Sequence, residues 1–203
     1  MSAVLSAVGE FFLYSIMAVF TQNAVFSRAF GVSRLLKLVD DEATDSLIFS
    51  LLVCVVQLLA APMSYYANWL IQPYWFADYV RPLALVLCTV ATFFIILGLV
   101  MLLFRMKLAK NILTVLPMAV FNCCVMGTLL ISATQSFTLL QTLGFALGSG
   151  LGYALAVWIV TESKRRLESS AVPATFRGLP IMLLYIGILA LAIYGFTGHM
   201  LAF

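Results

Sequence analysis

Long apolar segments separated by short polar ones dominate the pattern of this 203-residue chain. A helix needs about 20 apolar residues to cross the hydrocarbon core of a membrane. Six segments meet that requirement, at residues 4–26, 46–70, 80–104, 112–133, 139–160 and 179–201. The pattern therefore predicts an all-α polytopic membrane protein with six transmembrane helices.

The charged residues are few, and their placement predicts the orientation of the helices. Only 9% of the chain is charged, against about a quarter in soluble domains. Ten of the eleven basic residues follow the first, third and fifth apolar segments, where we expect connecting loops. Because basic loops stay in the cytoplasm, both termini are predicted to lie outside. The net charge of +3 sits in these short clusters and gives no indication of nucleic-acid binding.

One stretch inside the fourth apolar segment differs from a simple spanning helix. Residues 116–127 read LPMAVFNCCVMG, with Pro117, Asn122, Cys123 and Cys124 at membrane depth. Proline removes a backbone donor and interrupts a helix, and an asparagine in lipid must find polar partners. Polar groups on a broken helix inside a membrane usually mark a site where a substrate or ion is bound or transported.

The six segments also divide into two halves, residues 1–110 and 111–203. Three helices per half would give related halves opposite orientations in the membrane. The sequence AVFS at 24–27 is echoed by AVFN at 119–122, and a glycine follows each, Gly31 and Gly127. An inverted repeat and a chance repetition of four letters both remain open on this evidence.

Other polar and small residues suggest further roles. Glu10 is a candidate for an ion pathway or a side chain that reaches the interface, and Gln57 and Asn68 either pair across helices or line a polar cavity. The glycines of GFALGSGLG, residues 144–152, favour close helix packing over phosphate binding. The sequence shows no hydrolase or zinc constellation, and we predict no catalytic residue.

Three motifs in the second half resemble one membrane family, the A and E subunits of the Rnf complex and the D and E subunits of the sodium-translocating NADH:quinone reductase. The family signature Leu-Pro…Thr-Asn-Cys-Ala-x-x-Gly is matched by Leu116, Pro117, Asn122, Cys123 and Gly127. The stretches VPATFRG at 172–178 and GFTG at 195–198 match two further family elements in order.

The resemblance implies a fold and a function. The fold is two inverted three-helix repeats, each with a broken first helix, in the bacterial inner membrane. Two paralogous subunits of opposite orientation pair, and each gives two cysteines to a shared [2Fe–2S] cluster. The cluster relays electrons while Na⁺ or H⁺ crosses the membrane. On this basis the chain is a translocase subunit rather than a stand-alone enzyme, and other subunits of the complex carry flavin, nicotinamide or ferredoxin sites.

The first half departs from the family pattern at the predicted cofactor site. Asn122 and Cys123 are the cofactor-binding candidates in the second half, and Cys123 is the candidate metal ligand. In the first half Ser27 occupies the position of the family cysteine, and Met101 replaces a family glutamate. Two hypotheses follow: a subunit whose cluster uses Cys123 with Ser27, or a transporter-like or scaffold protein that keeps the fold without the cluster.

Overall fold

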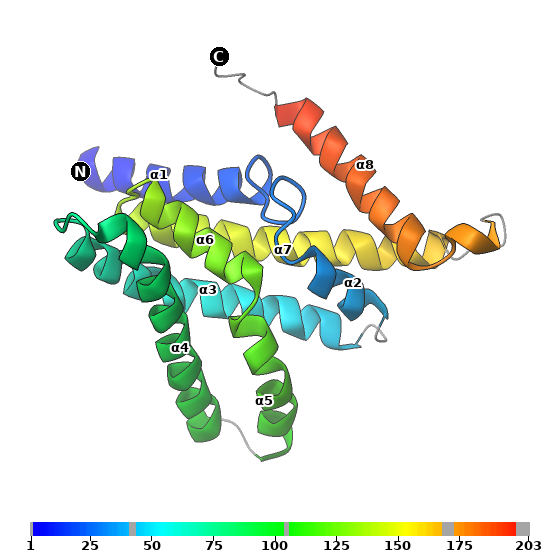
Figure 1. Cartoon of the computed structure of the whole chain (residues 1–203), viewed down its shortest axis with the longest axis horizontal. Coiled ribbons are helices and arrows are strands. Elements are labelled where there is room, and N and C mark those ends of the chain that lie inside the picture. Colours follow the sequence, from blue (N-terminus) through cyan, green and yellow to red (C-terminus); the bar gives the residue numbers. More distant parts are fainter. Residues whose placement is uncertain (1, 41–43, 104–105, 168–172, 198–203) are drawn as a thin grey trace.

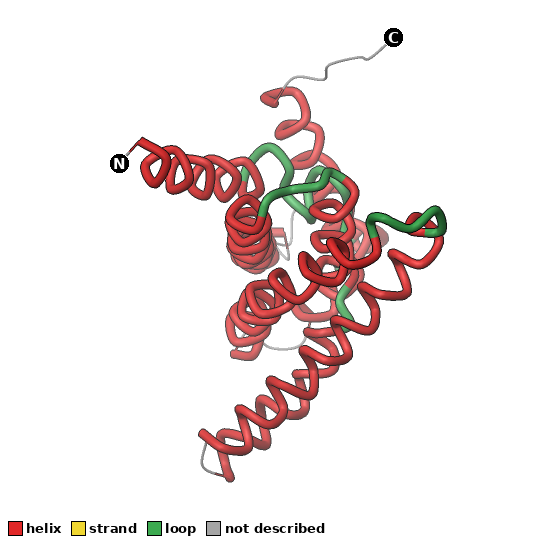
Figure 2. Tube along the Cα trace, turned by 90° about the vertical axis from the view of Figure 1, so that its left-hand side faces the viewer, coloured by secondary structure: helices red, strands yellow, loops and turns green. Residues whose placement is uncertain are grey.

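The computed structural model describes residues 2–40, 44–103, 106–167 and 173–197, and every regular element in these ranges is a helix (Figure 2). This confirms the all-α prediction. The helices are α1 (Ser2–Val19), α2 (Val32–Asp40), α3 (Thr44–Ile71), α4 (Ala77–Leu103), α5 (Met106–Val120), α6 (Cys123–Thr134), α7 (Leu139–Leu167), the 3₁₀ turn η1 (Ala174–Phe176) and α8 (Leu179–Thr197).

Helix α7 is the centre of the arrangement. It packs along α1 and along α3, and α6 and α2 also contact it (Figure 1). Helices α4 and α5 lie side by side next to α3. Helix α8 begins beside the end of α7 and runs away from it at an angle. The main buried cluster is centred on α3, α6 and α7 and also takes in side chains from α2, α4, α5 and α8.

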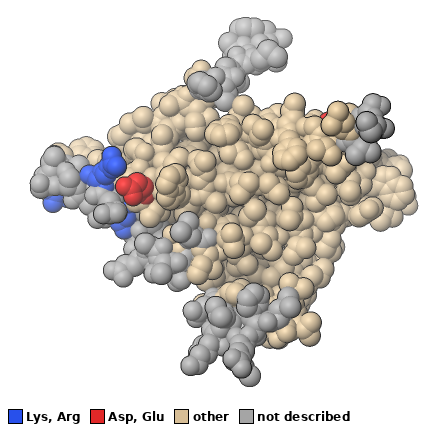
Figure 3. Space-filling model, turned by 180° about the vertical axis from the view of Figure 1, so that it is seen from behind, with Lys and Arg blue, Asp and Glu red and all other residues tan. Residues whose placement is uncertain are grey.

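Within the described ranges, three helices are long and apolar enough to cross a membrane, at Ile48–Ile71, Ala77–Leu102 and Leu139–Lys164. The pair α5 and α6, bent by 42° at their junction, passes the same test only when the two helices are taken together, as one broken span or a re-entrant segment. Apolar segments in α1 and α8 are shorter, at Leu5–Val19 and Leu179–Gly195. On the face seen in Figure 3, charged side chains gather mainly at one end of a wide uncharged surface. The chain is a multi-pass membrane protein by these properties.

Two segments differ from the sequence prediction. The first apolar segment was expected to be helical to residue 26, but α1 ends at Val19 and turns follow. The basic residues Arg34 and Lys37, expected in a loop, lie on the short helix α2. The end of the sixth predicted span, from residue 198 onward, lies outside the described residues.

The interruption of the fourth span also falls at a different residue from the one expected. The helix α5 continues through Pro117, and the break comes at Asn122, which caps α6. A capping side chain satisfies a free backbone N–H at the start of a helix. The asparagine rather than the proline therefore sets the boundary.

The glycine-rich segment of α7 packs closely against α1, as its sequence predicts. A methyl group built on Gly144 would overlap the carbonyl oxygen of Phe11, and one on Gly148 would overlap the carbonyl oxygen of Ser15. Without a hydrophobic driving force in lipid, such close backbone approach supplies the van der Waals contact that holds helices together.

We expect Gly148→Ala to destabilise the protein by about 1–3 kcal/mol, because the added methyl must separate α1 from α7. The measurement is the thermal unfolding midpoint in detergent, followed by tryptophan fluorescence. Gly98→Ala on α4 is the matched control, since a methyl there meets nothing within 4 Å. Equal midpoints for Gly148→Ala and the control would contradict the packing described here.

Candidate functional site

The segment between α1 and α2, residues 20–31, is called the first break. The buried side chain of Asn23 holds it in place. Its Oδ1 accepts hydrogen bonds from the backbone N–H groups of Val25 (2.9 Å) and Phe26 (3.2 Å). Its Nδ2 donates to the carbonyls of Val19 (2.8 Å) and of Gly152 on α7 (3.2 Å). One asparagine thus satisfies four backbone groups near the end of α1, as an apolar environment requires.

The chain then reverses through a tight turn into α2. The N–H of Phe30 donates to the carbonyl of Ala24 (2.8 Å), and Ala29 adopts a positive φ of 56°. Gly31 has φ +78°, a conformation that glycine adopts without strain. The Gly31 carbonyl accepts the first helical hydrogen bond of α2, from Leu35 (2.9 Å).

The second break, residues 121–122 between α5 and α6, also has an asparagine side chain that binds a backbone N–H. Asn122 has extended backbone angles and caps α6, and its Oδ1 accepts from the N–H of Cys124 (3.1 Å). The carbonyl of Pro117 accepts from the N–H of Phe121 (3.1 Å), which closes the last turn of α5. Cys123 is the first residue of α6 and its side chain is exposed.

The two breaks meet at one hydrogen bond. The backbone N–H of Gly31 donates to Sγ of Cys123 at 3.0 Å, across 92 residues of sequence. Gly31 also fits closely against Tyr153 of α7: a methyl there would lie 2.8 Å from the Tyr153 ring and 3.1 Å from Oδ1 of Asn122. The residue that precedes α2 therefore contacts the first residue of α6.

A second glycine completes the fit between the two breaks. The ring of Phe30 lies where a side chain on Gly127 would stand. Phe30 belongs to the first break and Gly127 to α6. Gly31 and Gly127, the two glycines noted in the sequence, therefore both allow the first break to pack closely against the start of α6.

A backbone N–H and a helix N-terminus adjoin the sulfur of Cys123. The N-terminus of a helix carries a partial positive charge, and its free N–H groups bind anions and thiolates. Cys123 stands at the N-terminus of α6 and accepts an N–H from the residue that precedes α2. The Cys123 side chain is thus exposed, carries a soft ligand atom, and lies at a helix N-terminus.

Cys124, the neighbouring thiol, has different surroundings. It is 0% exposed and its Sγ lies 3.3 Å from Nε2 of Gln57 on α3. The hydroxyls of Thr128 and Ser149 complete this buried group. A rotation of about 100° per helical residue separates adjacent side chains, so Cys124 faces the core while Cys123 faces outward.

Ser27 has no comparable setting. Its side chain is exposed, and its hydroxyl donates to the carbonyl of Thr21 (3.0 Å). It lines a cavity of about 640 Å³ between the first break and the apolar side chains of α8. The structure brings Asn122 and Cys123 together, whereas Ser27 is engaged with its own loop.

These residues fit a four-thiolate iron–sulfur cluster on one side only. Cys123 offers a thiol with a hydrogen bond to its sulfur, which is the usual environment of a cluster ligand. The other position offers a hydroxyl that is already hydrogen-bonded. Among the described residues, no three His, Cys, Asp or Glu side chains come together to hold a metal ion. The two breaks therefore supply one suitable ligand rather than two.

The remaining predicted residues lie away from the breaks. Glu10 is exposed on α1, where its Oε2 accepts from Nε2 of Gln141 (3.1 Å). Asn68 donates to the carbonyl of Ala133 and accepts from Arg81, so it pairs across helices. Met101 is exposed at the end of α4.

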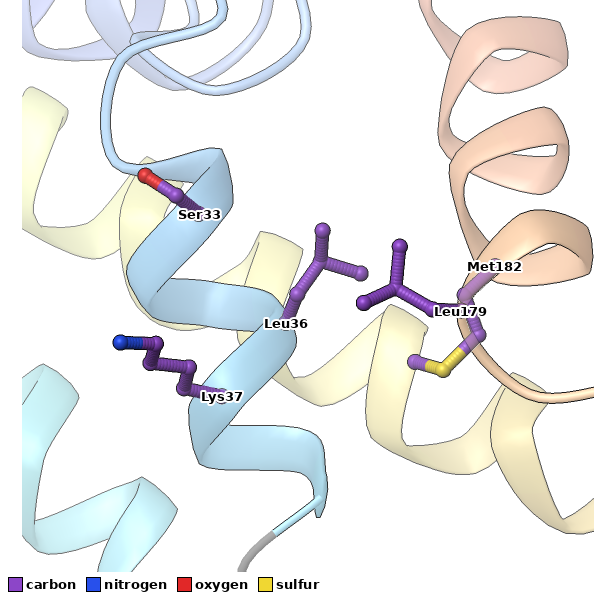
Figure 4. A pocket seen from close by; sticks show the side chains of 5 residues that line it. All are labelled: Ser33, Leu36, Lys37, Leu179 and Met182. Carbon is purple, nitrogen blue, oxygen red and sulfur yellow. The ribbon is translucent and has the colours of Figure 1, made fainter.

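A second cavity, of about 310 Å³, lies between α2 and α8 (Figure 4). The side chains of Leu36 and Leu179 point toward each other across it, while Lys37 extends away from α8. The cavity is therefore lined mainly by apolar groups, with the Lys37 ammonium turned away from α8.

Sequence reasoning missed Asn23, Tyr153 and Ser149. Asn23 follows Thr21 and Gln22 and looks like the polar end of a span. Ser149 lies within the glycine-rich stretch 144–152 and Tyr153 directly follows it, and the sequence analysis interpreted this stretch only as a helix-packing surface. A seven-residue spacing of polar side chains could have indicated Ser149, because it places two polar residues on the same face of a helix. The pairs with this spacing are all buried: Thr142 and Ser149 on α7, and Gln57 and Ser64 on α3.

Comparison with known proteins shows the family of this chain. Residues 11–200 match the family model described as "Rnf-Nqr subunit, membrane protein". The chain is 30% identical over 186 residues to the A subunit of an ion-translocating oxidoreductase complex of Syntrophotalea carbinolica, covering 92% of this chain and 95% of that protein. It is also 30% identical over 190 residues to the A subunit of the Na⁺-translocating ferredoxin:NAD⁺ oxidoreductase complex of Acetobacterium woodii, covering 90% and 94%.

A third relative, the A subunit of an ion-translocating oxidoreductase complex of Shewanella baltica, is 26% identical over 190 residues, covering 93% of this chain and 97% of that protein. The similarity thus extends over nearly the full length of each relative. The chain belongs to the Rnf-Nqr subunit family of membrane proteins.

Proposed function

We propose that this chain is an integral membrane subunit of an Rnf-type complex that moves Na⁺ or H⁺ across the bacterial inner membrane as electrons pass. The observation that carries the proposal is the Gly31–Cys123 contact, in which two interrupted segments place an exposed thiol at the N-terminus of α6, beside the residue that precedes α2. The names of the relatives support the same assignment.

The proposed architecture is six spans in two inverted three-helix halves, residues 1–110 and 111–203, with both termini outside. The bend between α5 and α6 and the turns between α1 and α2 are the corresponding breaks of the two halves. A paralogous subunit of opposite orientation is the proposed partner. Electron donors and acceptors belong to other subunits of the complex.

Cys123 is the proposed contribution of this chain to a [2Fe–2S] site shared with that partner. A bound cluster would supply one-electron transfer, and its potential responds to hydrogen bonds on its sulfur ligands. The Gly31 N–H would stabilise negative charge on the Cys123 sulfur. Asn122 would hold the start of α6 in place through its bond to the Cys124 N–H.

A second candidate function is a subunit that has kept the fold and lost the cluster. The hydrogen bond from Ser27 to Thr21 favours it, because a hydroxyl engaged there is a poor replacement for a thiolate. In this case the broken helices serve ion passage or assembly without a redox centre.

Iron content separates the two candidates. In the pair of membrane subunits, purified anaerobically from native membranes and separated from the ferredoxin-type subunits, we expect about two irons and two acid-labile sulfides per pair. Cys123→Ala should remove that iron while the two membrane subunits still copurify. Cys88→Ala is the control, because its thiol lies on α4 and contacts the Met63 carbonyl. Full iron in Cys123→Ala would refute the ligand assignment, and an iron-free wild-type pair would support the second candidate.

The proposed orientation predicts which surface positions react from outside the cell. Trp75→Cys, between α3 and α4 and 90% exposed in the wild type, should react with an impermeant maleimide in intact cells. Glu162→Cys, near the end of α7, should react only after the cells are permeabilised. Labelling of the wild-type chain gives the background from native cysteines. The reverse pattern would invert the topology, and labelling of both positions from outside would rule out the six-span arrangement.

A further inference from the structure

Helix α8 packs against the rest of the described chain along one narrow side. Of its described side chains, those of Met182 and Ile186 are buried, at 5% and 6% exposure, while the others are half-buried or exposed. A methyl group built on Gly187 would meet nothing within 4 Å. Two cavities lie against this helix, one beside its first residue, Leu179, and one that reaches Tyr194. Space is therefore left beside α8 at its start and further along it.

The cavity at the start of α8 has an apolar side and a polar side (Figure 4). Leu36, Leu179 and Met182 form the apolar side, between α2 and α8. The Ser33 hydroxyl and the Lys37 ammonium lie one helical turn apart on α2, and both point away from α8. A ligand that fills this cavity therefore needs an apolar part and a head group that accepts hydrogen bonds from a cation.

The charge of Lys37 is not neutralised by the residues that the structure describes. Its side chain is exposed and belongs to none of the ion pairs in this part of the chain. A further cavity against α8, on the side of α7, is lined by Glu162 and Arg166, which pair with each other at 3.7 Å. Charge complementarity with an anion therefore favours the cavity between α2 and α8.

The cavity also lies at the basic end of the molecule. Helix α8 begins beside the end of α7, which carries Lys164 and Arg166 (Figure 1). Arg177 lies two residues before α8. Basic residues at the ends of apolar helices mark the membrane surface, and basic pockets between such helices bind anionic lipid head groups. The position of Lys37 therefore suits a phosphate at the surface of the bilayer.

The second cavity provides room for an apolar chain. Its volume is about 640 Å³, and it is lined by Phe26 and Ser27 of the first break and by apolar side chains of α8. From Leu179 to Tyr194 the helix axis covers about 22 Å. One leaflet of the hydrocarbon core is about 15 Å thick, half of the whole core. An acyl chain that starts beside α2 thus has apolar protein surface to follow across its leaflet.

We propose that the cavity between α2 and α8 binds one anionic phospholipid. Its phosphate lies at Lys37 and Ser33, and an acyl chain passes between Leu36 and Leu179 and continues along α8. The ammonium selects an anionic head group over a zwitterionic one, and the apolar side selects a lipid over free phosphate. The lipid fills space that the described helices leave beside α8 and so holds this helix against α2. The inference depends on the membrane location of the chain and not on electron transfer.

The test compares two lipids that have the same acyl chains. The purified full-length protein in detergent is titrated with palmitoyl-oleoyl phosphatidylglycerol or with palmitoyl-oleoyl phosphatidylcholine, and the thermal unfolding midpoint is followed by tryptophan fluorescence. Phosphatidylglycerol should raise the midpoint by about 5–10 °C at a hundredfold excess over its Kd, and the rise should saturate. Native mass spectrometry should show one bound phosphatidylglycerol per chain. Phosphatidylcholine, which has no net charge, and glycerol 3-phosphate, which has no acyl chain, should give neither effect.

Variants locate the site. Lys37→Gln should raise the Kd for phosphatidylglycerol about fivefold or more, because one lysine near an anionic head group contributes at least that factor. Lys37→Arg should keep the binding of the wild type. Leu179→Trp should abolish the response while Lys37 is still present, because the larger side chain fills the apolar side. Arg166→Gln is the matched control, since it removes an exposed basic residue near the start of α8 but outside this cavity.

Arg166→Gln should bind phosphatidylglycerol like the wild type. An unchanged Kd in Lys37→Gln would overturn the site, as would equal responses of the wild type to phosphatidylglycerol and phosphatidylcholine. A full response to glycerol 3-phosphate would overturn the role of the acyl chain. Iron content and copurification with other subunits test the proposed function separately, so either inference can fail while the other stands.

Discussion

The need to satisfy every backbone polar group inside an apolar environment governs this structure. Helices achieve it automatically, but an interrupted helix leaves N–H and carbonyl groups without partners. Here one asparagine at each interruption takes over that task, Asn23 after α1 and Asn122 before α6. With these groups satisfied, the turn that follows Asn23 directs the Gly31 N–H toward the sulfur of Cys123. The chemistry of the site is a consequence of how the breaks are closed.

The same constraint explains why two neighbouring thiols have unrelated surroundings. Cys123 begins α6 and faces outward, with its sulfur at the helix N-terminus. Cys124 is one residue further and turns into the core, where it contacts neutral amide and hydroxyl groups. The position of the capping residue determines which cysteine faces which way.

Much of this arrangement is visible in the sequence, because membrane helices follow local composition. The apolar segments, the glycine packing of α7 and the interruption near Asn122 all follow from patterns within a few residues. The end of α1 was not predicted, because the segment stays apolar to residue 26 although three of the four hydrogen bonds of Asn23 are local. The fourth bond, to Gly152, crosses 129 residues and leaves no local pattern. The fit of Gly31 against Tyr153 is equally long-range. The hydrogen bond of Ser27 to Thr21 depends on a turn geometry that apolar periodicity does not encode.

The contact of α1 with α7 joins the beginning of the chain to its second half. Asn23 and Gly152 are 129 residues apart, and at about 5–20 residues per second the ribosome needs roughly 6–26 s to make that length. Until that length has been made, the face of α1 that packs against Gly144 and Gly148 has no partner on α7. The two halves, however similar, mature as one unit.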